Sequence, residues 1–296
     1  MNQTLEAFWK AVDDDLALYP MSAALEPLPQ HSTAASTTYA VRLTSVGPYR
    51  ISGVYSVPNH ADARAQVPGL LITPRYGSVN HIPDYYDRER YAVFQLTHRG
   101  QRRADQPFAA AYPGLLTLGI DNPETYIYRG IVADCIRGAE FLRSRPELDG
   151  DRVGIQGDDL ALITAARRPG FTAILASELL LYRLLEASQR TDAYPVEELN
   201  DYLRSAPESR AAVADTLAYF DPIHHIAALR SATMLTTVDA DGLGGQTWLD
   251  ALRSVCGGSC ETYRLSHKGA VDQVWLDAWL AGQLGAEPRS RFREQV

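Results

Sequence analysis

Two kinds of hydrophobic spacing along the chain predict its first elements. Residues 5–18 carry apolar side chains at helical spacing, and residues 123–145 do the same over a longer stretch that ends before a proline. Residues 38–57 instead alternate apolar and polar positions around a Gly-Pro turn, which predicts an antiparallel hairpin. We expect this hairpin to lie at an edge of a sheet.

Short, almost entirely apolar runs predict strands that are buried on both faces of a parallel sheet. These runs cover residues 67–73, 91–97, 171–176, 232–238 and 262–265. Helical segments lie between most of them, so the chain favours an α/β fold whose mostly parallel sheet has helices on both faces. The loops at 74–77 and 98–101 would then emerge at the carboxyl ends of adjacent strands, where such sheets place their ligands.

Residues 151–168 change from an apolar run to a helix-like segment at a glycine. They predict a strand, a sharp turn and a helix, which is the arrangement that presents the nucleophile in the α/β-hydrolase fold. The usual elbow sequence there is Gly-x-Ser-x-Gly, whereas residues 157–161 are Gly-Asp-Asp-Leu-Ala. Asp159 therefore stands where the serine is expected.

The length of 296 residues is enough for a sizeable core, and α/β chains of this size commonly form one domain. We therefore expect a single α/β-hydrolase domain over residues 1–296. Residues 179–220 are helical in pattern, charged and rich in Leu and Tyr. This segment is predicted to form a cap inserted over the sheet.

Composition narrows the partners and the compartment. The 28 basic residues are outnumbered by 36 acidic ones, so no nucleic-acid partner is expected. Three cysteines provide no disulfide framework and indicate a reducing compartment. No second Cys/His pair stands at ligand spacing, so we expect no metal and no cofactor. The first residues do not resemble a signal peptide and no apolar run is long enough to span a membrane, which favours a cytoplasmic protein.

Five short motifs, spread over most of the chain, carry a family resemblance. They are Tyr-Gly at 76–77, Arg-Gly-Gln at 99–101, the segment 119–129, Asp-Arg-Val-Gly at 151–154 and Tyr-Phe-Asp at 219–221. Together they resemble the acetyl xylan esterases and cephalosporin-C deacetylases, serine hydrolases that remove acetyl groups from sugars and related small molecules. The resemblance implies a small-molecule substrate and, because this family often associates, a homo-oligomer.

The resemblance also implies positions for the catalytic partners of the elbow. The family's acid falls on Asp241 and its histidine on His267, each after a predicted strand and in the chain order nucleophile, acid, histidine. Asp239 competes with Asp241 for the role of the acid.

Other site residues follow from the same resemblance. The backbone N–H of Tyr76 is expected in the oxyanion hole, and Gln101 belongs to a loop that braces the site, in which Arg99 is more often structural. Leu160 replaces the family's oxyanion glutamine in an ungapped alignment, so its backbone N–H is the remaining donor there.

Two departures from the family affect the chemistry. The family's elbow is Gly-Gly-Ser-Gln-Gly-Gly-Gly before Leu-Ala, and residues 157–159 are shorter by three residues or form a rebuilt turn. The family's His-Gly before Tyr-Gly is Pro74-Arg75 here, which stiffens the loop and adds a cation. Ordinary serine esterase activity is therefore not expected.

Three functions stay open from the sequence. Asp159 can act as a nucleophile, as in haloalkane dehalogenases and epoxide hydrolases, with His267 and Asp241 completing a triad that acts on a small ester-like molecule. Asp158 beside it raises the pKa of one carboxyl, which would suit an acid–base lyase or isomerase that uses Asp159 and His267. In the third alternative the two carboxylates cap the following helix, and the protein is a catalytically silent relative that binds or scaffolds.

Overall fold

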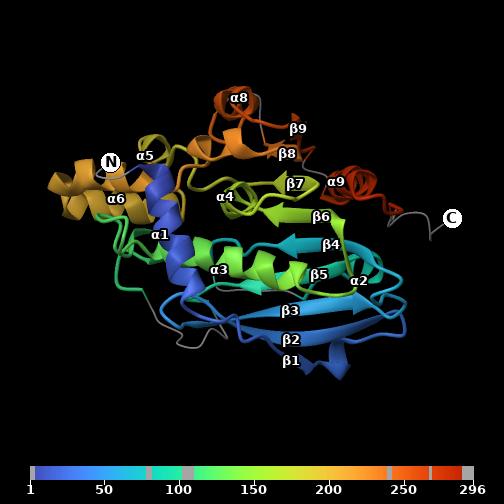
Figure 1. The fold of residues 1–296 in the computed structure, drawn as a ribbon. Helices are drawn as coiled ribbons and strands as arrows, with labels where there is room; N and C mark the ends of the chain where they lie inside the picture. The colour runs from blue at the N-terminus through green and yellow to red at the C-terminus, as the bar shows by residue number, and fades with distance from the viewer. Residues whose placement is uncertain (1–3, 78–81, 102–109, 239–241, 267–268, 289–296) are drawn as a thin grey trace.

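The computed structural model describes residues 4–77, 82–101, 110–238, 242–266 and 269–288. Within them, a sheet of nine strands forms the centre of the molecule (Figure 1). The strands are β1 (Ala24–Pro27), β2 (Ser36–Thr44), β3 (Arg50–Pro58), β4 (Val67–Ile72), β5 (Ala92–Thr97), β6 (Leu148–Gly157), β7 (Ala173–Ala176), β8 (Ala232–Thr237) and β9 (Cys260–Arg264). Their order across the sheet is β1-β2-β3-β5-β4-β6-β7-β8-β9.

The sheet is antiparallel at one end and parallel over the rest. β1 pairs with β2, β2 with β3, and β3 with β5, all antiparallel. From β5 through β4, β6, β7 and β8 to β9 every pair is parallel. The predicted mostly parallel sheet is confirmed, and β4 and β5 are neighbours as expected. The predicted hairpin, β2 and β3, is not at the edge, because β1 pairs with its outer strand.

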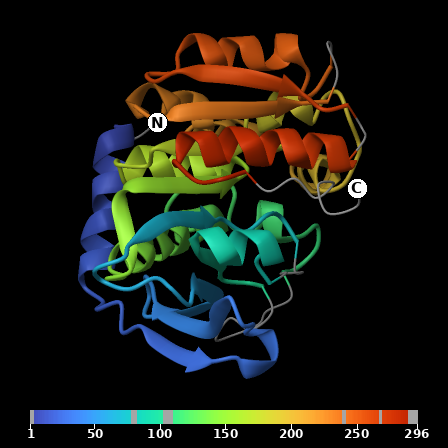
Figure 2. The same ribbon diagram turned by 90° about the vertical axis from the view of Figure 1, so that its right-hand side faces the viewer.

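Helices cover both faces of the sheet (Figures 1 and 2). The α-helices of the described residues are α1 (Leu5–Ala17), α2 (Tyr85–Arg90), α3 (Ile127–Arg143), α4 (Asp159–Arg167), α5 (Leu184–Ala187), α6 (Val196–Ser205), α7 (Arg210–Leu217), α8 (Gln246–Ser254) and α9 (Gly269–Gln283). Short 3-10 helices are η1 (Pro29–His31), η2 (Leu115–Thr117), η3 (Pro207–Ser209), η4 (Pro222–His224) and η5 (Ile226–Ala228).

Alternation of buried side chains along the central strands builds two apolar layers. Leu71 and Phe94 belong to the large cluster that contains α1, α3 and α4, and the Phe94 ring lies 4.7 Å from that of Phe141 on α3. Leu70 and Val93, one position before them, belong to the smaller cluster beneath α9. Successive strand residues point to opposite faces, so the all-apolar runs expected from the sequence fill both layers.

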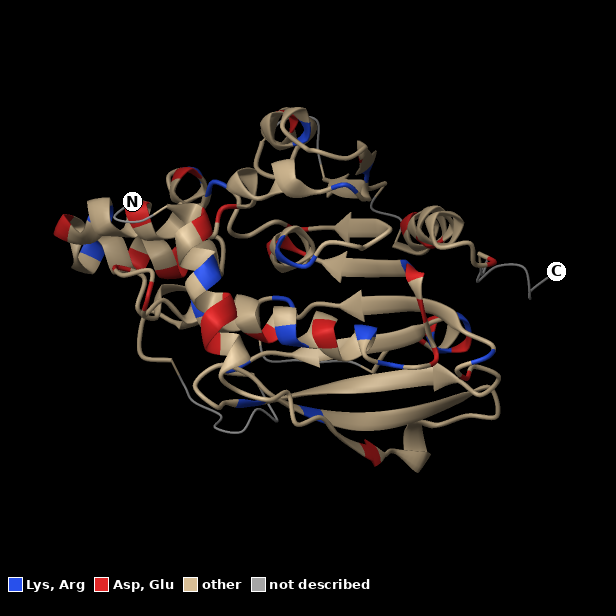
Figure 3. Ribbon diagram, viewed as in Figure 1, with Lys and Arg blue, Asp and Glu red and all other residues tan. Residues whose placement is uncertain are grey.

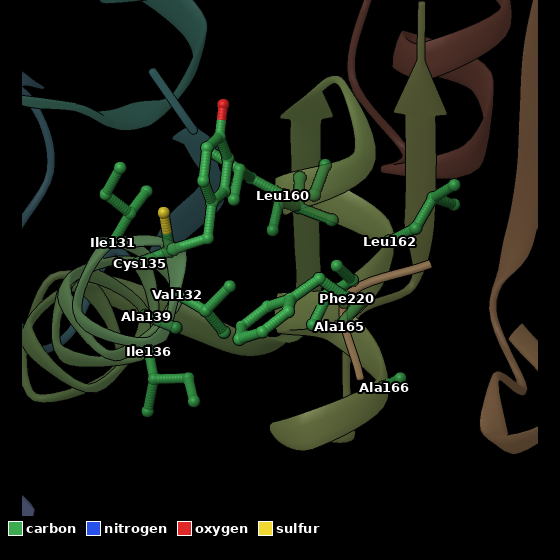
Figure 4. Packing of buried hydrophobic residues seen from close by; sticks show 14 of the residues in the cluster. Ile131, Val132, Cys135, Ile136, Ala139, Leu160, Leu162, Ala165, Ala166 and Phe220 are labelled. Carbon is green, nitrogen blue, oxygen red and sulfur yellow. The ribbon is translucent and has the colours of Figure 1, made fainter. Parts of the chain in front are cut away.

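The helix α4 is fixed in this core along almost its whole length. Figure 4 shows its apolar side chains, among them Leu160 and Ala165, beside Val132 and Cys135 of α3 and beside Phe220. Eight of its nine residues are buried. This packing fixes the N-terminus of α4 at the carboxyl end of β6, where the predicted elbow lies.

The segment 179–220 is helical, as its pattern predicts, and contains α5, α6 and α7. Its role as a cap on a single domain stays a prediction. None of the helices in the described ranges combines the length and the apolar character that a membrane crossing requires.

Candidate functional site

A cavity of about 500 Å³ lies at the carboxyl ends of the parallel strands. Loops after four of these strands contribute to its wall: Arg75 after β4, Asp158 after β6, Leu179 after β7 and Val238 after β8. This is the edge where open α/β sheets bind their ligands. Of the two loops expected at this edge, the one at 74–77 contributes Arg75 and Tyr76 to the cavity wall, whereas no residue of 98–101 lines the cavity.

The other walls of the cavity come from helical parts of the chain. Tyr194 and Pro195, just before α6, lie on one side, and Trp248 and Leu249 of α8 lie on another. The aromatic and aliphatic side chains give the cavity a largely apolar lining with a few polar groups, as is usual for small-molecule sites.

The turn between β6 and α4 brings a carboxyl group to this cavity. Gly157 ends β6, where a Cβ atom would stand 1.9 Å from the Thr73 hydroxyl, so only glycine allows β4 to approach so closely. Asp158 follows with φ −113° and ψ −143°, and its Oδ1 accepts a hydrogen bond of 2.9 Å from the backbone N–H of Leu160. Asp158 is thus the N-cap of α4, and its side chain also lines the cavity.

Asp159 is turned toward the loop that follows β7. Its Oδ2 accepts hydrogen bonds from the backbone N–H groups of Leu180 (2.5 Å) and Leu181 (2.9 Å), and its Oδ1 accepts one from Tyr182 (2.9 Å). Its side chain is 1% exposed. Both carboxylate oxygens are therefore engaged in holding a loop whose residues Leu179 and Leu180 line the cavity.

The two adjacent carboxyl groups influence each other's protonation. Burial raises the pKa of Asp158, against the opposing effects of the Leu160 N–H and the positive charge of Arg75. Burial, followed by the negative charge of Asp158, raises the pKa of Asp159, although the N–H groups of the β7 loop favour its ionised form. The pair thus retains a proton at higher pH than exposed carboxyl groups do.

Tyr76 connects the loop after β4 to α6. Its hydroxyl donates a 2.5 Å hydrogen bond to Oε1 of Glu198, a buried residue of α6. The backbone N–H of Leu116 donates both to the Tyr76 hydroxyl (3.1 Å) and to Oε2 of Glu198 (2.9 Å). Burial, with Glu198 beside it, raises the pKa of the Tyr76 hydroxyl, so Tyr76 stays protonated and acts as a donor. This network fixes one wall of the cavity.

Comparison with known proteins identifies the family. The model of the acetyl xylan esterase (AXE1) family matches residues 1–242. The chain belongs to the acetyl xylan esterase family. The acetyl esterase Axe7A of Xylanibacter ruminicola is 26% identical in an alignment 241 positions long that covers 75% of this chain and 53% of that protein. The chain thus spans about half the length of this relative.

Solved structures of acetyl xylan esterases share the fold. The acetyl xylan esterase from Paenibacillus sp. R4 superposes with a TM-score of 0.83 at 22% identity, covering 94% of both chains. Acetyl xylan esterase 1 from Thermoanaerobacterium sp. JW/SL YS485 gives a TM-score of 0.79 at 17% identity, covering 94% of this chain and 93% of that one. The predicted α/β-hydrolase fold and the family resemblance are confirmed.

The Arg-Gly-Gln loop of the acetyl xylan esterase family braces the neighbouring loop. Gln101 is 2% exposed, and its side-chain amide donates to the carbonyl oxygens of Gly77 (2.6 Å) and Arg75 (3.1 Å). Its Oε1 accepts from the backbone N–H of His98 (3.2 Å). Gln101 thus fixes the backbone on either side of Tyr76, which is the bracing role that the resemblance implies.

Arg99 forms a buried ion pair beneath this loop. Its guanidinium donates to both carboxylate oxygens of Asp134 on α3, at 2.9 and 2.8 Å, and its backbone N–H donates to the same group at 2.9 Å. The guanidinium passes over Gly130, where a Cβ would stand 2.6 Å from it. Arg99 is therefore part of the support of the site.

Four further residues predicted for the site are Leu160, His267, Asp241 and Asp239. The Leu160 side chain is buried in the core and its backbone N–H is bonded to Asp158, so this N–H is engaged within the turn. His267, Asp241 and the competing Asp239 lie outside the described residues, and the triad with Asp159 stays a prediction. Among the described histidines, none lines the cavity.

Sequence reasoning missed two residues that shape the site. The sequence predicts Asp158 only as a neighbour of Asp159 or as a helix cap, whereas Asp158 lines the cavity; an aspartate directly after a buried strand and before a helix is the available signal. Glu198 gave no signal, because a glutamate within a charged helix ordinarily faces solvent. The described residues contain no group of three or more His, Cys, Asp or Glu side chains that could hold a metal ion.

Proposed function

We propose that this member of the acetyl xylan esterase family binds a small molecule in the cavity above the sheet and does not perform serine-type ester hydrolysis. The observation that carries the proposal is the use of the two carboxyl groups at the turn after β6. Asp158 caps α4, and both carboxylate oxygens of Asp159 accept hydrogen bonds from three backbone N–H groups. Such groups build and support a cavity, whereas a nucleophile needs a lone pair directed at the substrate.

The support of the cavity agrees with a binding role. Gln101, Tyr76 and Glu198 hold the β4 loop, and Asp159 holds the β7 loop, each through part-buried hydrogen bonds. A site whose walls are fixed before the ligand arrives loses little entropy on binding. In this proposal the polar groups at this edge of the sheet act as scaffolding for the cavity.

The test is ester hydrolysis by the purified protein on 4-nitrophenyl acetate and on acetylated xylo-oligosaccharides. We expect acetate release no faster than in buffer, and no mass increase after treatment with a fluorophosphonate that labels activated serines. Rapid turnover with a fluorophosphonate adduct would contradict the proposal. Turnover without that adduct would instead favour the nucleophilic aspartate.

Two variants test whether turnover without a fluorophosphonate adduct comes from a nucleophilic aspartate. If Asp159 is a nucleophile, Asp159→Asn abolishes turnover in a folded protein, and His267→Gln accumulates an adduct on Asp159 that mass spectrometry detects. Asp14→Asn, the same change at an exposed position of α1, is the control and should leave turnover unchanged.

A second candidate, proton transfer by a carboxyl group, is favoured by one observation. The Asp158 side chain lines the cavity, and burial raises its pKa from its ordinary value toward the neutral range, where a general acid or base works best. Incorporation of solvent deuterium into the α-position of small ketones, followed by NMR, tests this candidate. Exchange that persists in Asp158→Asn at the wild-type rate would exclude it.

A further inference from the structure

Negative charge predominates at the cavity. Of the described charged side chains that line it, Asp158 and Glu178 are acidic and Arg75 is basic. Arg75 is already paired with Glu178 at 2.5 Å, at the exposed mouth. The Asp158 carboxylate, 6% exposed, therefore has no cation within salt-bridge distance among the described residues.

Further acidic groups lie directly behind the wall. Asp159 follows Asp158 in the chain, and Glu198 lies behind Tyr76; both are bonded to backbone N–H groups, and neither has a basic partner among the described side chains. Carboxylates beneath low-dielectric walls focus a negative potential into a cleft. Figure 3 shows positions of both charge signs along the ribbon.

The walls around this charge are apolar and aromatic. Leu180, Leu243 and Leu249 supply aliphatic surface, and Tyr194 stands at the mouth with its ring 5.7 Å from that of Tyr76, edge to face. Tyr194 is 71% exposed, so its ring is accessible to a ligand. An accessible aromatic ring and a carboxylate in the wall of one cavity are a combination that attracts organic cations.

We propose that the cavity selects a small organic cation, whose ammonium group pairs with Asp158 while its apolar part lies against the leucine and tyrosine walls. This inference rests on the proposed binding function and names the chemical class of the ligand. A buried carboxylate without a cation carries a desolvation cost that an ammonium group offsets and a neutral ligand does not. The ligand would thus supply the charge that the described residues lack at this position.

The other cations near the cavity do not favour an anionic ligand. Arg183 and Arg190 lie over the Trp248 ring, with guanidinium carbons 4.2 and 4.8 Å from its centroid. Both also pair with Glu186, outside the cavity. A carboxylate ligand would therefore meet Asp158 without a free basic partner among the described lining residues, and like charges at close range repel.

Calorimetry with three matched probes tests the inference: 3-phenylpropylammonium, 3-phenylpropan-1-ol and 3-phenylpropionate. At about pH 8 we expect the ammonium compound to bind about tenfold or more tightly than the alcohol, since a hydrogen bond to a charged group contributes that much, and the carboxylate to bind least. In Asp158→Asn the ammonium compound should lose this advantage and bind like the alcohol. Asp14→Asn, a change of the same type on the exposed side of α1, should leave all three affinities unchanged.

Each alternative outcome decides one of the two proposals. Equal binding of the alcohol and the ammonium compound, or an ammonium preference that survives Asp158→Asn, overturns the cation inference and leaves a binding cavity in place. Failure of the ammonium compound to bind at millimolar concentration also overturns it. Serine-type turnover in the ester assay contradicts the proposed function, whatever the probes do.

Discussion

Two of the buried carboxylate sites in the protein, one in the support of the β4 loop and one at the turn after β6, are stabilised in different ways. At one, Asp134 is fully buried and paired with the guanidinium of Arg99 through two hydrogen bonds. At the other, Asp158 and Asp159 have only backbone N–H groups as bonded partners among the described residues. In the first place the charges cancel, whereas in the second the negative charge remains and faces the cavity.

This difference separates support from function. The Arg99–Asp134 pair holds the loop after β5 on α3, and the guanidinium already compensates the charge of the carboxylate. Adjacent buried carboxyl groups with raised pKa values, which have no basic partner among the described residues, are costly to the fold, and such groups gather at functional sites. Mutations that remove the cation from the ion pair, or the charge from one of the adjacent carboxyl groups, test this contrast.

Breaking the Arg99–Asp134 pair should have the largest effect. Arg99→Met leaves the Asp134 carboxylate buried without a cation, so we expect the free energy of unfolding to fall by about 3–5 kcal/mol in urea denaturation. Replacing both residues by apolar ones should cost less than Arg99→Met alone, because no unpaired charge is then buried.

An exposed pair is the control for this prediction. Lys10 and Asp14 on α1 are 73% and 65% exposed, and Lys10→Met should change stability by less than about 1 kcal/mol. An Arg99→Met protein as stable as the wild type would show that the buried pair is not the support described.

The second largest expected loss of stability comes from changing Asp159, whose carboxylate holds the β7 loop. Asp159→Asn replaces one accepting oxygen by an amide N–H, which then faces at least one backbone N–H of residues 180–182. A buried donor left without an acceptor costs about 1–3 kcal/mol, so we expect a loss of that size and faster hydrogen exchange at these three amides.

Hydrogen exchange at residues 180–182 tests directly whether the Asp159 carboxylate holds the β7 loop. Unchanged protection of residues 180–182 in Asp159→Asn would contradict the role assigned to the carboxylate. Asp158→Asn should leave their protection as in the wild type, since that change keeps the cap of α4.

The sequence predicted the parts of the fold that depend on local pattern. The all-apolar runs became β4 and β5, and the amphipathic stretches became α1 and α3. β1 was not predicted, because its four residues show no alternation and three of them are exposed. It forms by pairing with β2, with Ala24 opposite Arg42. Pairing between distant segments leaves no periodicity in the shorter partner.

The site was predictable in position and less so in detail. A strand, a turn and a helix at 151–168 identified the cavity edge, but not which of two adjacent aspartates faces it. Successive side chains on a helix point about 100° apart, so a shift of one position exchanges cavity and core. The partners of Asp159 are backbone N–H groups 21 to 23 residues later, and backbone donors have no sequence signature.

The smallest predicted effect is a pH dependence at Asp158, which sharpens the contrast between the two places. The titratable or charged groups that influence or face it are Asp159, Arg75, Glu178, Tyr128 and Cys135. Because its folded-state pKa is raised, the folded protein keeps a proton that the unfolded chain loses above about pH 4, so this group lowers stability as the pH increases. Asp158→Asn removes that loss and relieves the repulsion on Asp159.

We therefore expect Asp158→Asn to match the wild type in thermal unfolding near pH 4 and to exceed it near pH 8, by about 1.4 kcal/mol for each unit by which folding raises the pKa of Asp158. The Arg99–Asp134 pair gives the opposite comparison, since Asp134→Asn should destabilise the protein at both pH values by removing the partner of a buried cation. A stability difference between Asp158→Asn and the wild type that stays constant from pH 4 to pH 8 would mean that the pKa of Asp158 in the folded protein is not raised above its ordinary value. The carboxylate would then already be stabilised by a positive charge, and the cavity would have less need of a cationic ligand.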